Sequence, residues 1–233
     1  MTDTGGLSME RYFLIEVLDV NPEGVRGSGR GEAMVGGALG DRLDSDAGDD
    51  TLVGSSGDDT LIAGDGSDYV SGGDGDDHIV GGAGYQSLNG DDGNDDIYGG
   101  GDADGFFGGA GDDALHGGTG ADYMVGGTGD DSLYGGLGDD QLLGGTGADL
   151  IVTGEGHDYI IFAVGDGRET IADFDVLSDV INLGAFAGLD TLDDVLNRSS
   201  QQGADTVIDL GGGDVLILAN VRKETLQGAD FYL

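Results

Sequence analysis

The stretch that decides the fold reads GGTGDDSLYGGLGDDQLLGGTGADLIV and spans residues 126–152. It consists of three blocks of nine residues, and each block has a glycine pair, a further glycine, an aspartate and an apolar residue at fixed offsets. Self-similarity at a fixed short period is the signature of a solenoid, in which equal units stack along one axis. The positions of each block are numbered 1 to 9 from the glycine pair, so that the pattern can be followed along the chain.

The same period runs through fourteen consecutive blocks from Gly36 to Ile161 without an insertion or deletion. Position 6 is aspartate in thirteen blocks, the exception being Gln86, and position 4 is glycine in all blocks except those with Leu39 and Asp102. Position 8 is apolar in every block. These residues are Leu43, Leu52, Leu61, Val70, Ile79, Leu88, Ile97, Phe106, Leu115, Met124, Leu133, Leu142, Ile151 and Ile160.

The pattern within a block predicts a short strand followed by a tight turn. The strand is centred on position 8, whose side chain points inward while those at positions 7 and 9 point outward. The six residues before it reverse the chain, and glycine supplies the positive φ angles that such turns require. Two blocks then complete one coil of eighteen residues. The sequence therefore predicts an all-β fold, a parallel β-roll (β-solenoid) of fourteen nonapeptide repeats.

The aspartates at position 6 pose an electrostatic problem for such a roll. Stacking the coils places these carboxylates one above another, and one apolar residue per block buries too little surface to offset the backbone entropy and this repulsion. Carboxylates combined with turn carbonyl oxygens, without His or Cys, are the ligand chemistry of Ca2+. The candidate metal ligands are Asp41, Asp59, Asp77, Asp95, Asp113, Asp131 and Asp149 on one edge and Asp50, Asp68, Asp104, Asp122, Asp140 and Asp158 on the other.

The blocks follow the pattern GGxGxDxUx, where U is apolar, and residues 36–161 resemble the RTX (repeats-in-toxin) β-roll proteins exported by type I secretion. This resemblance implies that each Ca2+ lies between adjacent turns of one edge, bound by position-6 aspartates and backbone carbonyls. It also implies a type I secretion machinery as partner and a secreted, extracellular or cell-surface location. Gln86, Asp102 and Leu39 depart from the pattern, so we expect incomplete calcium occupancy near them.

The flanking segments have a different composition. Residues 1–35 are expected to be an N-terminal cap or linker: charged residues interrupt the apolar stretch 7–20, which argues against a signal peptide, and 21–33 resembles a linker. Residues 162–233 are expected to form a β-rich C-terminal capping region, with strands in 165–183 and 203–221 and a short helix in 191–200 that Thr191 caps. This region is similar to the C-terminal flank of RTX proteins, which seals the last coil and carries the secretion signal.

The overall composition narrows the possible partners. The 233 residues include 52 glycines and no cysteine, and the formal net charge is −39. Such an excess of acid would repel nucleic acid, and no apolar run is long enough to cross a membrane. A disordered linker is the competing interpretation of so much glycine and aspartate, and without calcium we expect the chain to be disordered.

Catalytic motifs are missing from the sequence, so we expect no enzyme. There is no HExxH, GxSxG or phosphate-loop motif, and His78, His116 and His157 are interpreted as turn or surface residues. The sequence favours a secreted calcium-binding structural protein that folds on Ca2+ binding outside the cell, such as a surface-layer, matrix or filament component. The alternative is a C-terminal RTX module of a larger secreted enzyme, such as a protease, lipase or epimerase. Self-association through the apolar segment 7–20 is a further expectation.

Overall fold

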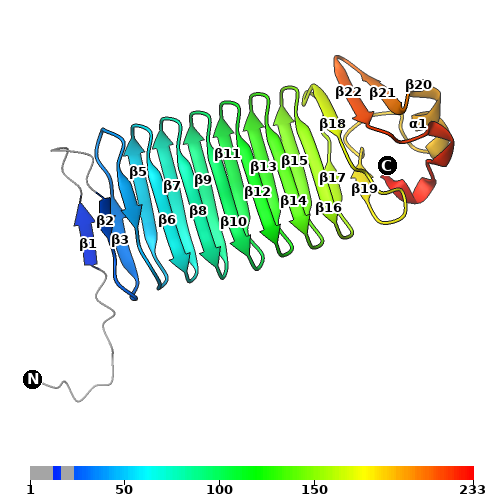
Figure 1. Ribbon diagram of the computed structural model, residues 1–233. Coiled ribbons are helices and arrows are strands. Elements are labelled where there is room, and N and C mark those ends of the chain that lie inside the picture. Colours follow the sequence, from blue (N-terminus) through cyan, green and yellow to red (C-terminus); the bar gives the residue numbers. More distant parts are fainter. Residues whose placement is uncertain (1–12, 17–23) are drawn as a thin grey trace, which may run out of the picture.

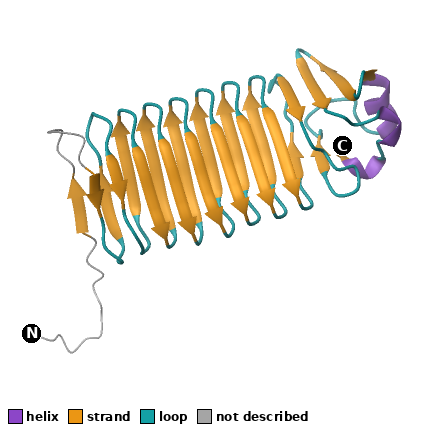
Figure 2. Cartoon of the chain, in the orientation of Figure 1, coloured by secondary structure: helices purple, strands orange, loops and turns teal. Residues whose placement is uncertain are grey.

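Two parallel β-sheets face each other along the length of the molecule, and successive strands alternate between them (Figure 1). The computed structural model describes residues 13–16 and 24–233. Strands fill the two faces, loops form the two edges, and the helical elements are confined to the C-terminal end (Figure 2). Among the described residues, no helix combines the length and apolar character that crossing a membrane requires.

The first sheet contains the odd-numbered strands from β1 to β19 and, at its end, β23. In spatial order these are β1 (Phe13–Glu16), β3 (Glu32–Val35), β5 (Thr51–Ser56), β7 (Asp68–Asp74), β9 (Gln86–Asp92), β11 (Gly105–Ala110), β13 (Tyr123–Thr128), β15 (Gln141–Thr146), β17 (Tyr159–Ile161), β19 (Val180–Asn182) and β23 (Phe231–Tyr232).

The second sheet contains the even-numbered strands and ends in an antiparallel hairpin extension. Its order is β2 (Gly24–Arg26), β4 (Arg42–Asp44), β6 (Thr60–Asp65), β8 (His78–Ala83), β10 (Asp96–Gly101), β12 (Ala114–Thr119), β14 (Ser132–Leu137), β16 (Leu150–Glu155), β18 (Arg168–Ile171), β22 (Asp214–Leu218), β21 (Asp205–Gly211) and β20 (Ser199–Gln202).

The strands pair in parallel with the register that the repeat predicts. Met124 of β13 pairs with Leu142 of β15, and Leu115 of β12 pairs with Leu133 of β14. The all-β parallel roll is therefore confirmed. The strands are longer than expected, because most of them continue from position 7 through the glycine pair to position 3, as in Tyr123–Thr128. Glycine at position 1 of most blocks faces the interior, where an added Cβ would crowd the carboxylate of its block and the carbonyl of the next coil.

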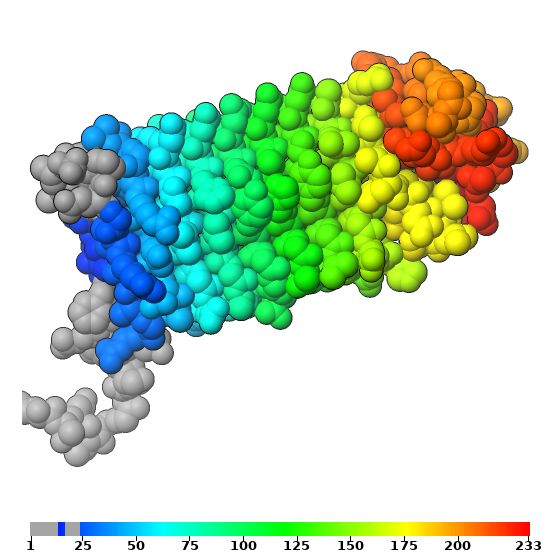
Figure 3. All heavy atoms as spheres, in the orientation of Figure 1, coloured from blue at the N-terminus to red at the C-terminus, as the bar shows by residue number. Residues whose placement is uncertain are grey.

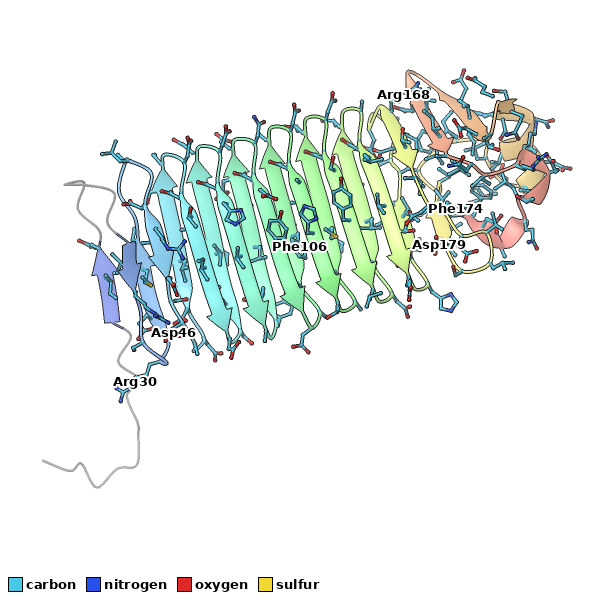
Figure 4. The ribbon with its side chains drawn as sticks, in the orientation of Figure 1. Arg30, Asp46, Phe106, Arg168, Phe174 and Asp179 are labelled. Atoms are coloured by element: carbon cyan, nitrogen blue, oxygen red, sulfur yellow. The ribbon has the colours of Figure 1, made fainter. Side chains whose placement is uncertain are left out.

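The core is a single file of apolar side chains between the two sheets. All fourteen position-8 residues are fully buried, with exposures of 0–1%. Phe106 is the largest of them and lies near the middle of the roll (Figure 4). The coils stack without a visible break between the two ends (Figure 3). One buried side chain per block is thus the whole apolar contribution of each repeat.

The N-terminal segment contributes strands that differ from the expected linker. Residues 24–26 pair with β4, and Glu32–Val35 pair with β5 with Met34 fully buried. Glu32 and Met34 stand at positions 6 and 8 of a further nine-residue unit, which is why this segment continues the roll. Of the apolar stretch 7–20, only residues 13–16 are described, and they form the strand β1 beside β3.

The C-terminal segment closes the other end of the roll. β18 and β19 continue the two sheets, and β20, β21 and β22 form an antiparallel extension. The expected short helix is confirmed as α1 (Leu192–Arg198), and the Thr191 side chain accepts a hydrogen bond from the Asp194 backbone N–H. Two 3-10 helices, η1 (Lys223–Thr225) and η2 (Gly228–Asp230), precede β23. Phe162 and Phe186 pack against each other beneath this cap.

Candidate metal-binding turns

The thirteen predicted aspartates lie in two rows, one along each turn edge of the roll. Each stands at or just before the start of a strand, and each side chain is buried, with exposures of 1–6%. Carboxylate oxygens line both edges of the ribbon in Figure 4. One row contains Asp41, Asp59, Asp77, Asp95, Asp113, Asp131 and Asp149, and the other contains Asp50, Asp68, Asp104, Asp122, Asp140 and Asp158. The two rows contain the same residues that position 6 of alternate blocks predicts for the two edges.

One oxygen of each carboxylate belongs to a ladder of hydrogen bonds between coils. The backbone N–H of a position-6 residue donates to Oδ1 of the position-6 aspartate eighteen residues later, as Asp113 does to Asp131 at 2.8 Å. The same bond recurs along both rows at 2.6–2.9 Å. These bonds fix the height and direction of every carboxylate except that of Asp41, which accepts from the Gly37 backbone N–H of its own turn.

The other oxygen of nearly every carboxylate has no partner. Oδ2 is buried and unbonded in twelve of the thirteen predicted aspartates, all except Asp41. A buried polar atom without a hydrogen bond costs about 1–3 kcal/mol, and more when it carries charge. Two long rows of such atoms therefore require a group that is not part of the chain.

Glycine at position 1 gives these oxygens their room. A Cβ added at Gly126 would lie 2.4 Å from Asp131 Oδ2 and 2.4 Å from the carbonyl oxygen of Gly144, one coil later. The same crowding by the carboxylate of the block and the carbonyl of the next coil recurs at Gly54, Gly72, Gly90, Gly108, Gly117 and Gly135. A carboxylate oxygen and a backbone carbonyl oxygen therefore both border the space beside the position-1 glycine.

Burial dominates the electrostatics of the rows. Desolvation raises the pKa of Asp77, Asp104, Asp113 and Asp140 to about 7, and neighbouring carboxylates add to the rise. Backbone N–H donors oppose these shifts only in part. At neutral pH a folded roll without cations would hold two rows of partly ionised, buried acids, which is an unfavourable state.

The donor set fits a hard divalent cation. The described ion pairs of Arg and Lys involve Asp44, Asp46 and Glu224, so no basic side chain neutralises a position-6 carboxylate in the described chain. Nor do three or more acidic, His or Cys side chains cluster into a side-chain-only metal site there. Ions would be held by one carboxylate per rung together with turn carbonyl oxygens, a ligand set typical of Ca2+.

The first turn and the Gln86 rung depart from this arrangement. Asp41 Oδ2 accepts a 2.7 Å hydrogen bond from the Gly37 backbone N–H, so this carboxylate is satisfied locally. Gln86 is fully buried and turns its amide nitrogen toward the Gly66 carbonyl oxygen at 3.2 Å. Asp102 adopts the positive φ of the glycine it replaces. Whether calcium occupies these turns stays a prediction.

Residues beyond the repeats extend both rows. Glu169 stands in register with Asp149, because Leu150 pairs with Thr170, and Asp179 stands in register with Asp158, because Tyr159 pairs with Val180. The sequence interpretation missed both, since the coil lengthens to twenty or twenty-one residues there. Alignment of the DxUx ending of each block with ETIA and DVIN would have been the available signal.

Position 5 forms a second, exposed ladder that the sequence interpretation also missed. Here the side chain accepts from the backbone N–H eighteen residues later, as Asp112 does from Asp130 at 2.8 Å. The same bond is made by Asp49, Asp58, Asp76, Asn94, Asp130 and Asp139. These acids organise the turn while facing solvent, as expected for solvated neighbours of the buried row.

The three histidines lie outside the turn interior. His116 stacks between Tyr98 and Tyr134 on the outer face of the second sheet, with ring centroids 4.5 and 4.7 Å away. His78 contacts Asp96, with Nδ1 3.4 Å from a carboxylate oxygen. His157 lies on a turn, with Nδ1 3.2 Å from the Ser178 carbonyl oxygen. No hydroxyl of the described Ser and Thr residues hydrogen-bonds to these imidazoles, so no nucleophile is paired with a base there.

Comparison with known proteins agrees with this geometry. The family model described as "RTX calcium-binding nonapeptide repeat (4 copies)" matches residues 35–70, 53–85, 71–106, 81–115, 107–142 and 134–168, which together make up more than half of the chain. No curated protein matches. Among solved structures, the extracellular lipase LipA from Serratia marcescens is similar at 17% identity with a TM-score of 0.47. That match covers 94% of this chain and 42% of the lipase chain.

Proposed function

The chain belongs to the RTX calcium-binding nonapeptide repeat family, and from this premise we propose that it is a secreted structural protein that folds when calcium binds outside the cell. Members of this family are typically exported by type I secretion, and the bound ion is Ca2+.

The observation that carries the proposal is the stacking of buried, unpartnered carboxylate oxygens. Twelve aspartates each present a buried Oδ2 without a hydrogen bond. Calcium supplies the positive charge that these rows lack. The chain's own groups do the rest: Oδ1 fixes each side chain to the previous coil, and position-1 glycine leaves room for the neighbouring carbonyl oxygen.

The same acids keep the chain unfolded where calcium is scarce. With a net charge of −39 and one buried apolar side chain per block, the calcium-free chain repels itself and gains little from burial. Extracellular calcium sites are tuned to about 10⁻⁴–10⁻³ M, far above cytosolic calcium. An unfolded chain can pass through a secretion channel, and folding then follows export.

A structural role is the favoured use of the folded roll. The described residues form one continuous solenoid with capping elements, and none of the histidines is placed as a catalytic base. In the alternative, this roll is the C-terminal module of a larger secreted enzyme. Immunoblotting of the producer's culture medium separates them: a secreted band near 23.4 kDa supports the structural protein, and a much larger band supports the enzyme module.

Self-association is part of the proposed structural role. β1 is the outermost strand of the first sheet, and no described strand pairs with its second edge, so we expect this edge to pair with another chain. We expect ordered, calcium-dependent assemblies, because the docking surface exists only in the folded roll. Light scattering in millimolar calcium tests this on the full chain and on a chain lacking residues 1–30. Monodisperse monomers of the full chain would refute assembly, and equal assembly of both would exclude the N-terminal segment as its cause.

The calcium dependence itself is tested by titrating calcium into the calcium-free chain while following β-structure by circular dichroism. The proposal expects a cooperative gain of β-structure at submillimolar to millimolar calcium, with magnesium much less effective because it retains its own waters. Equal β-structure at all calcium concentrations would remove the basis for folding after export.

A further inference from the structure

The last repeat and the C-terminal cap meet at an acidic pair formed by Asp149 and Glu169. Glu169, on β18, is 1% exposed and stands in register with Asp149, the last position-6 aspartate of its row. Neither carboxylate oxygen of Glu169 has a hydrogen-bond partner. Asp149 Oδ2 is likewise buried and unpartnered. Three buried carboxylate oxygens from two side chains therefore face one another without a donor from the rest of the described chain.

These three oxygens converge on one place. A Cβ added at Gly144 would lie 2.4 Å from Asp149 Oδ2 and 2.7 and 2.8 Å from the two oxygens of Glu169. In the regular rungs this side of the glycine is occupied by the carbonyl oxygen of the next coil. Glu169 thus replaces a backbone carbonyl with a carboxylate whose longer side chain reaches back toward Asp149.

The other buried acids of the cap behave differently. Asp166 accepts from the Ala163 N–H at 2.6 Å, and Asp214 accepts from the N–H groups of Gly165 and Gly167. Asp179 and Asp230 likewise accept from backbone N–H groups. Among the buried acids of described residues 162–233, Glu169 alone lacks a partner for both oxygens. Hydrogen bonds from backbone N–H groups, which satisfy the other buried acids of the cap, therefore do not explain the burial of Glu169.

We propose that Asp149 and Glu169 form a calcium site that joins the cap to the last repeat, outside the sites that pairs of nonapeptides provide. This inference rests on the proposed calcium-dependent fold and names a ligand that the repeat pattern does not supply. A glutamate that offers both oxygens is a common calcium ligand, and two carboxylates balance the charge of one Ca2+. More ligand charge also strengthens the site relative to rungs with one carboxylate each.

The sparse pairing between β16 and β18 supports a role of this site in holding the cap to the last repeat. β16 and β18 are paired at only two positions, Leu150 with Thr170 and Ile151 with Ile171, whereas β14 and β16 are paired at five. Calcium at this site connects β18 to the turn that ends at Asp149. Figure 4 labels the neighbouring Arg168 at this junction.

The test counts calcium ions by native mass spectrometry on the full chain. Glu169→Gln keeps the shape of the side chain and removes its charge, and Glu155→Gln makes the same change at an exposed turn position of the same coil. We expect Glu169→Gln to bind one ion fewer than the wild type and to lose part of the calcium-induced rise in melting temperature, while Glu155→Gln matches the wild type in both.

Equal ion counts for Glu169→Gln and Glu155→Gln would overturn the site. So would a loss of melting temperature that is the same at low and at high millimolar calcium, because that marks a purely structural hydrogen bond. Failure of the wild type to fold with calcium would instead refute the proposed function. Hydrogen exchange on the wild type is independent of any variant: amides of β18 should gain protection as calcium is added, and full protection without calcium would also overturn the proposal.

Discussion

The side-chain amide nitrogen of Gln86 lies 3.2 Å from the carbonyl oxygen of Gly66, in the coil before it, where its row otherwise carries carboxylates. The amide also opposes part of the burial-driven rise in the pKa of Asp68. The Asp68 backbone N–H, which would donate to a carboxylate, donates instead to the Tyr85 carbonyl oxygen at 3.2 Å. A neutral donor therefore stands between two coils where the pattern calls for a cation and its ligand.

Replacing this amide with an acid should restore the row. Gln86→Asp supplies an acceptor for the Asp68 N–H and a carboxylate for calcium, so we expect a lower calcium midpoint of folding, measured by circular dichroism. Gln141→Asp is the matched control, because it makes the same change at an exposed position. Identical midpoints for the two variants would contradict the assignment of position 6 as the ligand position.

Neutralising one regular rung should have the opposite effect. Asp122→Asn retains an acceptor for the Asp104 N–H, now bonded at 2.8 Å, but removes the charge that calcium requires. We expect the calcium midpoint to rise and the calcium-bound fold to lose about 1–3 kcal/mol. Asp130→Asn, at an exposed position-5 site, should change neither quantity appreciably. The prediction fails when isothermal titration gives both variants the same affinity.

Acid should partly replace calcium. Burial raises the pKa of Asp59 and Asp95 to about 6 and that of Asp77 and Asp113 to about 7. An aspartate in the unfolded chain has a pKa of about 4. Because the folded-state values are raised, these groups stabilise the calcium-free fold fully below about pH 4, and the contribution is lost as pH rises through about 6 to 7.

The measurement is circular dichroism of protein freed of calcium by desalting, from pH 8 down to pH 5. We expect β-structure to increase as the pH falls. With calcium present the trend should reverse, since protons compete with the ion for the carboxylates. A calcium-free chain whose spectrum is independent of pH over this range would show that the buried acids do not oppose folding.

Position-1 glycines should resist substitution for steric reasons alone. A Cβ at Gly99 would lie 2.5 Å from both Asp104 Oδ2 and the Phe106 ring, whereas at Gly101 the nearest atom, Thr119 Oγ1, would be 3.4 Å away. Neither glycine has a positive φ. We expect Gly99→Ala to lower the melting temperature in calcium and raise the calcium midpoint, with Gly101→Ala close to wild type. Equal effects would mean that the tight approach at position 1 is unimportant.

The repeat itself allowed most of the roll to be predicted. Position 8 identified the file of large apolar side chains from Leu43 to Ile160, and position 6 identified both rows of carboxylates, because stacking equal coils repeats one local geometry. The prediction failed where the coils no longer have eighteen residues. Glu169 joins a row only because the coil there has twenty residues instead of eighteen, so the nine-residue period does not point to it.

The repeat pattern also could not predict which hydrogen-bond partner each turn side chain takes. Asp41 has the same place in its block as Asp131, yet its second oxygen bonds the Gly37 N–H of its own turn. That choice depends on atomic distances at the first full turn, not on residue type. The exposed ladder at position 5 was missed for a related reason. Asp and Asn are common turn residues, and the sequence does not show that their side chains accept from the backbone N–H eighteen residues later.

The central claim is that calcium makes this chain fold, and circular dichroism on the full chain at neutral pH and moderate ionic strength tests it most directly. The account predicts a spectrum of a disordered chain after calcium removal, and a β-rich spectrum that returns when millimolar calcium is restored. A β-rich spectrum that persists unchanged when EGTA removes the calcium would contradict it, because the two rows of buried carboxylates would then be stable without the ion.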